Sequence, residues 1–213
     1  MDSTHILAIR HGETDWNVAT RIQGQIDISL NAQGEWQAKQ VAKALSDEDI
    51  HAVYASDLSR ASITAEHIAS HHGLAVAKYT ALRERHYGFF EGQTWDEIQA
   101  AHPEDALRWR DRDPHWTPKS GGESLMMLHE RVNQMVNEIA SRHRGEQITL
   151  VTHGGVLDIL YRIATGQDLQ VARSWGLRNT AINRLLWTPQ GLKLVGWADE
   201  RHLDTDAREE SST

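Results

Sequence analysis

The sequence predicts an α/β protein with three layers, α/β/α, in which helices cover both faces of a mostly parallel central sheet. Three observations lead to this fold class. Short apolar runs alternate with helical patterns, a hairpin pattern lies near residue 190, and residues 85–122 have little strand character. The 213 residues contain no linker rich in Pro, Gly or Ser, so we expect one domain over 1–198 and a polar, acidic tail over 199–213.

Four short apolar runs have the length and composition of buried strands, at residues 6–9, 52–54, 75–77 and 148–151. Strands that alternate with helices are connected in parallel, so these four runs predict the parallel part of the sheet. Two further patterns, 181–187 and 192–197, flank Pro189-Gln190-Gly191, which is typical of a hairpin. The hairpin is expected to add its strands at one edge.

Start and stop residues mark the first three predicted helices. Asn31 can cap a helix that runs to about residue 45. A second helix over 59–72 can end at Gly73, in the position that favours a left-handed residue. Thr94-Trp95-Asp96-Glu97 is a capping box, which predicts the start of a third helix.

Two more helices follow in the second half of the chain. The clearest spans 124–143, and a last one over 156–165 is stopped by Gly166. The apolar stripe of the clearest helix consists of Leu125, Leu128, Val132, Met135, Val136 and Ile139. Residues 85–122, which hold three of the four prolines and three of the eight tryptophans, predict a small helical cap inserted over one end of the sheet.

Composition excludes several classes of function. The net charge of −8 argues against nucleic acid as a general partner. No apolar run approaches the roughly 20 residues that span a bilayer, so no membrane association is expected. The chain has no cysteine, which excludes disulfides, thiolate catalysis and Cys-ligated zinc and favours a cytoplasmic location.

Two distant strands of the predicted sheet each run into a His-Gly pair. Residues 6–9 lead into Arg10-His11-Gly12, and residues 148–151 lead into Thr152-His153-Gly154. Ligands of parallel sheets bind outside the carboxyl ends of the strands, so both histidines are expected at one site, on strands that are plausibly adjacent. The alternative is that each histidine is only a polar residue that meets solvent at a strand end.

A third segment places a cation at the same end of the sheet. Residues 52–54 lead to Ser59-Arg60, where a helix is expected to open. A helix N-terminus favours anions, and the guanidinium of Arg60 offers planar donors to phosphate oxygens. The alternative is a surface arginine that pairs with a nearby carboxylate.

At this point the sequence resembles the histidine phosphatase superfamily, whose best-known branch is the cofactor-dependent phosphoglycerate mutases. The resemblance covers roughly residues 6–183, and its motifs follow the order and spacing of that family. They are Arg10-His11-Gly12-Glu13-Thr14, Trp16-Asn17, Gln23-Gly24, Ser56-Asp57-Leu58-Ser59-Arg60-Ala61, Leu82-Arg83-Glu84, Glu91-Gly92, Gly121-Gly122-Glu123-Ser124 and Thr152-His153-Gly154-Gly155.

The resemblance implies that His11 is a nucleophile, which forms a phosphohistidine that water then breaks. Attack requires a neutral imidazole, and the like charges of Arg10, Arg60 and His153 would lower the pKa of His11. These cations would also stabilise the transferring phosphoryl group. Additional phosphate contacts are expected from Asn17, Gln23 and Gly154.

Glu84 matches the proton donor of the family. The sequence by itself does not distinguish this carboxyl group from those of Glu13, Glu91 and Glu123. The alternative role for Glu84 is a salt bridge with Arg83 or Arg85.

No metal is implied, and no cofactor beyond 2,3-bisphosphoglycerate, which is expected only if the protein is a mutase. The sequence has neither a Walker loop nor a His-Glu-x-x-His helix. Asp111-Arg112-Asp113 is similar to the Asp-x-Asp of metal-dependent phosphatases, but it follows a polar helix rather than a buried strand.

Two enzyme functions share this chemistry. Arg85-His86-Tyr87-Gly88 resembles the mutase branch, but Asp111 stands where mutases have the second of two arginines that hold the substrate carboxylate. We therefore favour a phosphomonoester phosphatase acting on a small phosphorylated metabolite, with the mutase as alternative. A non-catalytic phosphoester-binding protein is a minor alternative, because the full catalytic set is present.

The substrate pocket is the least determined part of the site. Its candidates on the cap side are Trp16, His86, Tyr87, Trp109, Arg110 and Arg112. Aromatic rings would suit an organic alcohol, and Arg110 or Arg112 a second anionic group. The eight tryptophans also leave a homodimer contact open.

Overall fold

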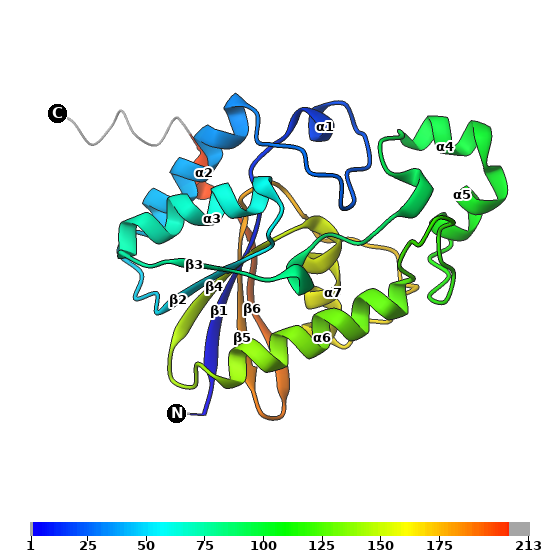
Figure 1. The fold of residues 1–213 in the computed structure, drawn as a ribbon. Helices are drawn as coiled ribbons and strands as arrows, with labels where there is room; N and C mark the ends of the chain where they lie inside the picture. The colour runs from blue at the N-terminus through cyan, green and yellow to red at the C-terminus, as the bar shows by residue number, and fades with distance from the viewer. Residues whose placement is uncertain (1, 205–213) are drawn as a thin grey trace.

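Figure 1 shows the fold of the computed structural model, which describes residues 2–204. Within that range the sheet has six strands: β1 (Thr4–Arg10), β2 (Ala52–Ala55), β3 (Val76–Lys78), β4 (Gln147–Thr152), β5 (Ile182–Thr188) and β6 (Gly191–Asp199). Their order is β3-β2-β4-β1-β5-β6, in which the first four are parallel and the last two form an antiparallel hairpin at one edge. The mostly parallel sheet and its edge hairpin are confirmed.

Two pairs of helices cover the two faces of the sheet, α2 (Ala32–Ala44) with α3 (Ser59–His72) and α6 (Leu125–Ser141) with α7 (Gly154–Thr165). The other helices are α1 (Asp15–Val18), α4 (Trp95–Ala101) and α5 (Pro103–Arg110), with the short 3-10 helices η1 (Thr80–Leu82), η2 (Gly88–Phe90) and η3 (Arg201–Leu203). Alternate side chains of β1 point to opposite faces. Leu7 and Ile9 pack with α2 and α3, whereas Ile6 and Ala8 pack with α6 and α7. The three-layer fold is confirmed.

The start and stop residues act as the sequence predicts. The side chain of Asn31 accepts a hydrogen bond from the backbone N–H of Gly34 at the start of α2. Gly73 and Gly166 follow α3 and α7 in the left-handed conformation, with φ of 64° and 69°. The whole predicted apolar stripe of α6 is buried. These local signals fix where the helices that flank the site begin and end.

Residues 88–110 form a helical unit, drawn in green in Figure 1, that carries η2, α4 and α5. It has its own small core, made of Phe90, Ile98 and Ala106 together with Trp116 from the loop that follows α5. An isolated bridge between Arg21 and Thr94 joins it to the loop after α1. This unit therefore stands beside the loop that follows the carboxyl end of β1.

The segment after residue 198 is partly regular. Strand β6 continues to Asp199, and η3 packs against α2. The tail expected over 199–213 therefore begins inside the folded domain, and its residues 205–213 lie outside the described residues.

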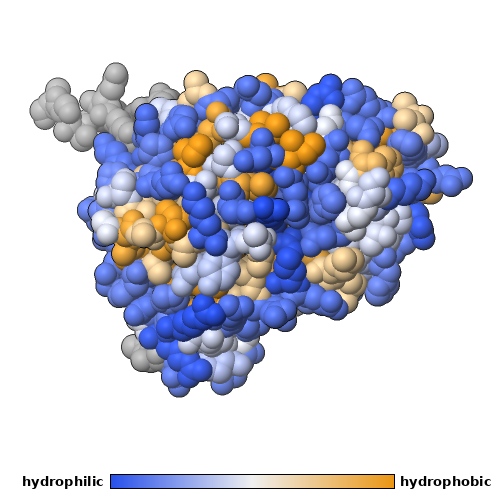
Figure 2. Space-filling model, viewed as in Figure 1, coloured by the Kyte–Doolittle hydropathy of each residue, from blue (hydrophilic) through white to orange (hydrophobic). Residues whose placement is uncertain are grey.

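The face of the molecule in Figure 2 is mostly hydrophilic, with apolar side chains in small groups. Of the helices that the structure describes, none has both the length and the apolar character needed to cross a membrane.

Candidate active site

His11 and His153 follow neighbouring strands. Strands β1 and β4 pair in parallel with Arg10 opposite Thr152, so the next residue of each strand is a histidine at the same edge of the sheet. The two imidazole centroids are 5.1 Å apart. The exposed fractions are 3% for His11 and 0% for His153, so neither is a polar residue that meets solvent. The topology thus brings together two residues that are 142 positions apart in the sequence.

The hydrogen bond of the His11 ring determines which of its two nitrogens carries the hydrogen. Its Nδ1 lies 2.7 Å from the carbonyl oxygen of Gly12, and a carbonyl only accepts, so Nδ1 carries the hydrogen. Nε2 therefore keeps its lone pair in the neutral ring. Burial, followed by the charges of Arg60 and Arg10, holds the pKa of His11 well below its usual value. A cavity of about 170 Å³ opens beside this ring.

Gly12 is required for close packing of the loop after β1 against α2. A Cβ at this position would lie 2.4 Å from the carbonyl oxygen of Gly34 in α2. No side chain fits between the two backbones, so Gly12 lets the loop that carries His11 rest directly on α2.

Arg60 is the second residue of α3 and is fully buried. Its two terminal nitrogens donate to the carbonyl oxygens of Gly24 and Ile26, each at 2.8 Å, and thereby fix the loop that forms one wall of the cavity. No ion pair to a carboxylate is found for it among the described residues, so the alternative of a surface salt bridge is wrong. Burial lowers the pKa of Arg60 to about 10, so the group is still charged at neutral pH.

Polar atoms without partners gather around His11. Among the described residues, buried nitrogens of Arg10, Arg60 and His153 lack any hydrogen-bond partner, and so does the buried carboxamide oxygen of Gln23. Such atoms are rare in folded proteins, because removing a polar atom from water without giving it a new hydrogen-bond partner costs free energy. Two guanidinium N–H groups and an imidazole in one place indicate a ligand that accepts hydrogen bonds and carries negative charge.

Asn17 lines the same small cavity at the end of α1. Its side-chain oxygen accepts from the backbone N–H of Thr14, which leaves the amide N–H groups for other partners. Asn179, which the sequence did not single out, donates to the backbone oxygen of His11 at 2.8 Å. Gly154 begins α7, and its backbone lines the larger neighbouring cavity.

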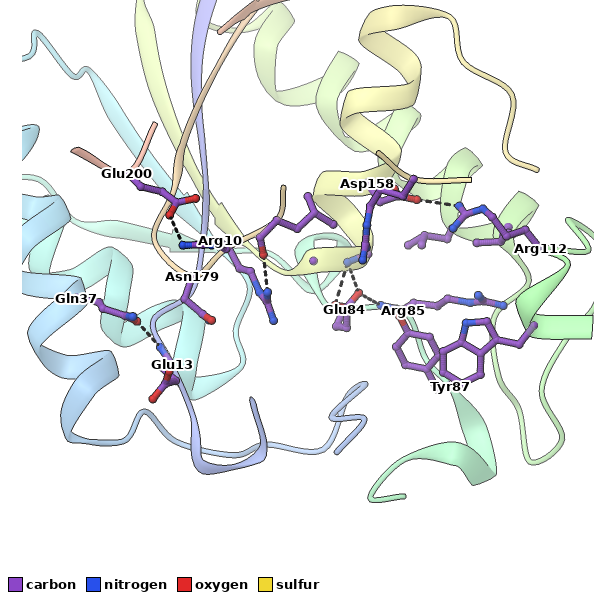
Figure 3. A pocket seen from close by; sticks show the side chains of 18 of the residues that line it. Arg10, Glu13, Gln37, Glu84, Arg85, Tyr87, Arg112, Asp158, Asn179 and Glu200 are labelled. Atoms are coloured by element: carbon purple, nitrogen blue, oxygen red, sulfur yellow. Dashed lines mark hydrogen bonds and ion pairs between the residues drawn. The ribbon is translucent and has the colours of Figure 1, made fainter. Parts of the chain in front are cut away.

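Glu84 is distinguished from the other candidate carboxylates by its position. It lines both the small cavity and a larger cavity of about 790 Å³. Its oxygens accept from the backbone N–H of Gly155 at 3.0 and 3.1 Å and from that of Arg85 at 2.7 Å (Figure 3). Arg83 instead pairs with Asp57 at 2.6 Å, and Arg85 makes no ion pair with Glu84, so the salt-bridge alternative is wrong.

The other three carboxylates are engaged elsewhere. Glu13 accepts from the side chain of Asn31, Glu91 from the backbone N–H groups of Gln25 and Tyr87, and Glu123 pairs with Arg131 at 2.7 Å. Glu84 is the carboxylate that these contacts leave facing the small cavity beside His11.

The larger cavity contains half of the predicted pocket residues. Tyr87 stacks on Trp109 with centroids 5.0 Å apart, and both line the two cavities. Arg112 lines the larger one and pairs with Asp158 at 2.8 Å. Figure 3 shows this pair opposite Tyr87.

The other three pocket candidates lie outside both cavities. The ring of Trp16 packs over Gly92, and the ring of His86 contacts the carbonyl oxygen of Gly121. Arg110 is exposed and pairs with its neighbour Asp111 at 3.5 Å. Trp16, His86 and Arg110 therefore line neither cavity in this structure, and a role for them in the substrate pocket stays a prediction.

The fold and this histidine-arginine site define a phosphoryl-transfer class, and comparison with known proteins agrees. The chain belongs to the histidine phosphatase superfamily (branch 1), whose profile matches residues 6–200. It is 39% identical to phosphoglycerate mutase-like protein 4 of Arabidopsis thaliana, covering 96% of this chain and 89% of that protein. It is 37% identical to the metal-independent phosphoserine phosphatase of the same plant, covering 95% and 84%.

A solved structure has the same fold. The mycobacterial glucosyl-3-phosphoglycerate phosphatase is 30% identical and superimposes with a TM-score of 0.83, covering 93% of this chain and all of that one. Among residues 2–204, no group of three or more His, Asp or Glu side chains is placed to hold a metal ion.

Proposed function

We propose that this chain is a phosphomonoester phosphatase that acts on a small phosphorylated metabolite through a phosphohistidine at His11. The observation that carries the proposal is the set of buried, unpartnered donors of Arg10, Arg60 and His153 around a ring whose Nε2 bears the lone pair. A phosphoryl group satisfies these donors and places phosphorus in front of the nucleophile.

In the first half of the reaction, Nε2 of His11 attacks phosphorus and the P–O bond to the alcohol breaks. The guanidinium groups of Arg10 and Arg60 stabilise the charge on the equatorial oxygens. Glu84 gives a proton to the departing alkoxide. In the second half, Glu84 takes a proton from water, whose oxygen attacks phosphorus and breaks the P–N bond. Inorganic phosphate leaves and His11 is neutral again.

The mutase is the second candidate, favoured by the 39% identity to phosphoglycerate mutase-like protein 4. The expected repulsion of the substrate carboxylate by Asp111 does not separate the two functions, because that side chain is 61% exposed and lies outside both cavities. The size of the larger cavity favours hydrolysis, since it admits water beside a small phosphorylated group. The names of the phosphoserine and glucosyl-3-phosphoglycerate phosphatases support the same choice.

The proposal includes catalysis without a metal ion. The positive charges of Arg10 and Arg60 supply the stabilisation that a cation gives in other phosphatases, and one relative is named as metal-independent. It extends to a cytoplasmic location, which the absence of cysteine favours. It also extends to a homodimer, to which the partly exposed indole of Trp95 could contribute.

Rapid mixing with phosphorus-labelled substrate tests the proposal. The wild-type protein should yield an acid-labile, base-stable phosphoenzyme and release inorganic phosphate, and His11→Ala should yield neither. Label that persists without His11 contradicts the mechanism. Efficient isomerisation of 3-phosphoglycerate after priming with 2,3-bisphosphoglycerate, with little phosphate release, would instead identify a mutase.

A further inference from the structure

The connection between α7 and β5, residues 166–181, forms one wall of the larger cavity. No helix or strand lies within these residues, all of which the structure describes. From residue 166 to residue 174, every side chain except that of Leu169 is exposed. Burial of apolar surface therefore does not hold this part of the wall in place, so polar contacts have to do so. The side chains of the connection that line the cavity are Arg173, Leu177, Arg178 and Asn179.

Two arginines bind the backbone at the start of this connection. Nε of Arg112, which follows α5, donates to the carbonyl oxygen of Leu169. The terminal nitrogens of Arg162, in α7, donate to the carbonyl oxygens of Asp168 and Val171, the second at 2.9 Å. Hydrogen bonds from a charged donor are stronger than those between neutral groups. Guanidinium groups from two different segments thus hold three carbonyl groups of a short stretch of chain.

One carboxylate joins both arginines. Oδ2 of Asp158 accepts from a terminal nitrogen of Arg112 at 2.8 Å (Figure 3) and from Nε of Arg162 at 3.0 Å. The side chain of Asp158 is 7% exposed and that of Arg162 is 1% exposed. Among the described residues, no other carboxylate pairs with either arginine. Without Asp158, two largely buried guanidinium groups would lie close together without a counterion, which is unfavourable.

Arg162 also contacts the connection further along. Its Cζ lies 4.8 Å from the ring centroid of Trp175, where the aromatic ring attracts the positive charge. The same indole stacks on Tyr161, with centroids 4.0 Å apart. The contacts that Asp158 organises therefore reach from residue 168 to residue 175, and Arg173, which lines the cavity, lies within this span.

We infer that Asp158 is a positioning residue for the substrate pocket. Through Arg112 and Arg162 it fixes residues 168–175, and it thereby sets how strictly the larger cavity selects the alcohol portion of a phosphoester. The inference rests on the proposed phosphatase function and goes beyond it, because Asp158 does not line the small cavity beside His11. Its loss should therefore change the binding of substrate and not the transfer of the phosphoryl group.

Hydrogen exchange of the backbone, followed by mass spectrometry, reports on the wall independently of activity. The N–H groups of residues 167, 170 and 171 donate hydrogen bonds, so their exchange requires the start of the connection to open. Asp158→Asn keeps the size of the side chain and removes its charge. It should speed exchange at these residues by about tenfold, the scale of one charge-assisted hydrogen bond. Exchange in β1 and β4 should not change.

Arg112→Gln is an independent second variant, because this side chain is 21% exposed and its loss leaves Arg162 paired with Asp158. It should speed the same exchange. Glu200→Gln is the matched control, since it removes a carboxylate that lines the same cavity and pairs with Arg178 at 3.2 Å. It should leave the exchange near that of the wild type. Unchanged exchange in a variant that folds, or equal acceleration in the control, overturns the inference.

Phosphate esters of increasing length test the consequence for selection. The primary phosphate monoesters of ethylene glycol, glycerol, erythritol and xylitol have leaving groups of similar acidity, so Glu84 should assist all of them equally. The wild-type protein should discriminate along this series. Asp158→Asn and Arg112→Gln should each narrow the range of kcat/KM values by at least about threefold, and the change should lie in KM.

Two kinetic results contradict this role of Asp158. One is a wild-type protein that does not discriminate along the series, and the other is a loss in Asp158→Asn that lies in kcat and is equal for all esters. A wild-type protein that forms no phosphoenzyme from any ester would instead contradict the phosphatase function, and the exchange measurement would still decide whether Asp158 fixes the wall.

Discussion

The carboxylate of Glu84 accepts hydrogen bonds from the backbone N–H of Gly155 with both of its oxygens, at 3.1 and 3.0 Å. A Cβ at position 155 would lie 2.3 Å from Oε1 of Glu84. Gly155 therefore leaves the space in which the carboxylate meets the first turn of α7. The position of the proposed proton donor depends on a residue that has no side chain.

Gly155→Ala is expected to displace Glu84 without unfolding the protein, because the atom that must move is the end of a flexible side chain. The variant should lose about 10²-fold in kcat/KM on alkyl phosphates, the usual scale for general acid catalysis. It should lose much less on aryl phosphates, whose leaving groups need little protonation. A series of phosphate esters with leaving groups of graded acidity measures this difference.

Two comparisons define the result. Glu84→Gln should show the same selective loss on alkyl phosphates. Gly154→Ala, whose added Cβ would meet nothing closer than 3.8 Å, should leave the alkyl-to-aryl ratio near that of the wild type. Equal losses on both ester types in Glu84→Gln would assign Glu84 to phosphate positioning rather than to proton transfer.

Arg60→Ala should lower turnover by at least about 10²-fold, as expected when a donor to the transition state is removed. The substitution also releases the carbonyl oxygens of Gly24 and Ile26, so KM for substrate should rise as well. Arg144→Ala is a suitable control, because Arg144 lies in the turn before β4, lines neither cavity and pairs only with Asp2 at 3.7 Å among the described contacts. Near wild-type kinetics of Arg60→Ala would refute the assigned role.

The burial of His11 and His153 makes stability depend on pH. Burial is the main cause that lowers both pKa values below 6.5, and the charge of Arg60 adds to it. Below about pH 6.5 the unfolded chain therefore binds protons that the folded chain does not. The melting temperature should fall as the pH drops from about 6.5 towards the pKa values of the folded protein. Above about pH 6.5 the two histidines should contribute no pH dependence to the melting temperature.

Differential scanning calorimetry between pH 7.5 and 5, at about constant ionic strength, measures this dependence. Replacement of both histidines by glutamine should reduce the slope. An unchanged slope in that double variant would show that other groups cause it. The same lowered pKa of His11 predicts that kcat/KM keeps its value at pH 6, where an ordinary histidine would already be charged.

Activity should survive treatment with EDTA, because the site provides its positive charge through arginines. Vanadate should inhibit, because it adopts the five-coordinate geometry of in-line transfer. Its oxygens can accept hydrogen bonds from the unpartnered Nε–H groups of Arg10 and Arg60. Loss of activity on chelation that a divalent ion restores would overturn the metal-independent mechanism and direct attention back to Asp111 and Asp113.

The placement of Arg10, His11 and Arg60 in the candidate phosphate site could be predicted from sequence because the signals are local. Arg10 and His11 directly follow a buried strand, and Arg60 opens a helix, so each position is set by its own segment. The adjacency of β1 and β4 then brings these segments together. The residues of the substrate pocket could not be predicted in the same way. Trp16, His86 and Arg110 have suitable chemistry, but whether they line a cavity depends on how α1 and residues 85–122 pack, and no local pattern records that packing.

Asn179 and Arg173 were missed for a related reason. They lie in an irregular connection without a motif, and what brings them to the site is the pairing of β5 with β1. The backbone N–H of Thr180 donates to the oxygen of Arg10, which anchors this connection beside His11. The one available signal was the position of Asn179 three residues before the first strand of the hairpin, and Arg173 had none.

The antiparallel edge has a consequence for how this enzyme can change. The connection from α7 to the hairpin, residues 166–181, passes the site before the chain reaches β5. It forms one wall of the larger cavity, and this wall is not part of the parallel sheet. The two cavities share only Arg10, Glu84, Tyr87 and Trp109 among their lining residues. We therefore expect substitutions in that wall to alter which alcohol is accepted and to leave the proposed bond-breaking step at His11, Arg60 and His153 intact. On the proposed mechanism, selectivity and reactivity are separable properties, encoded in different stretches of the chain.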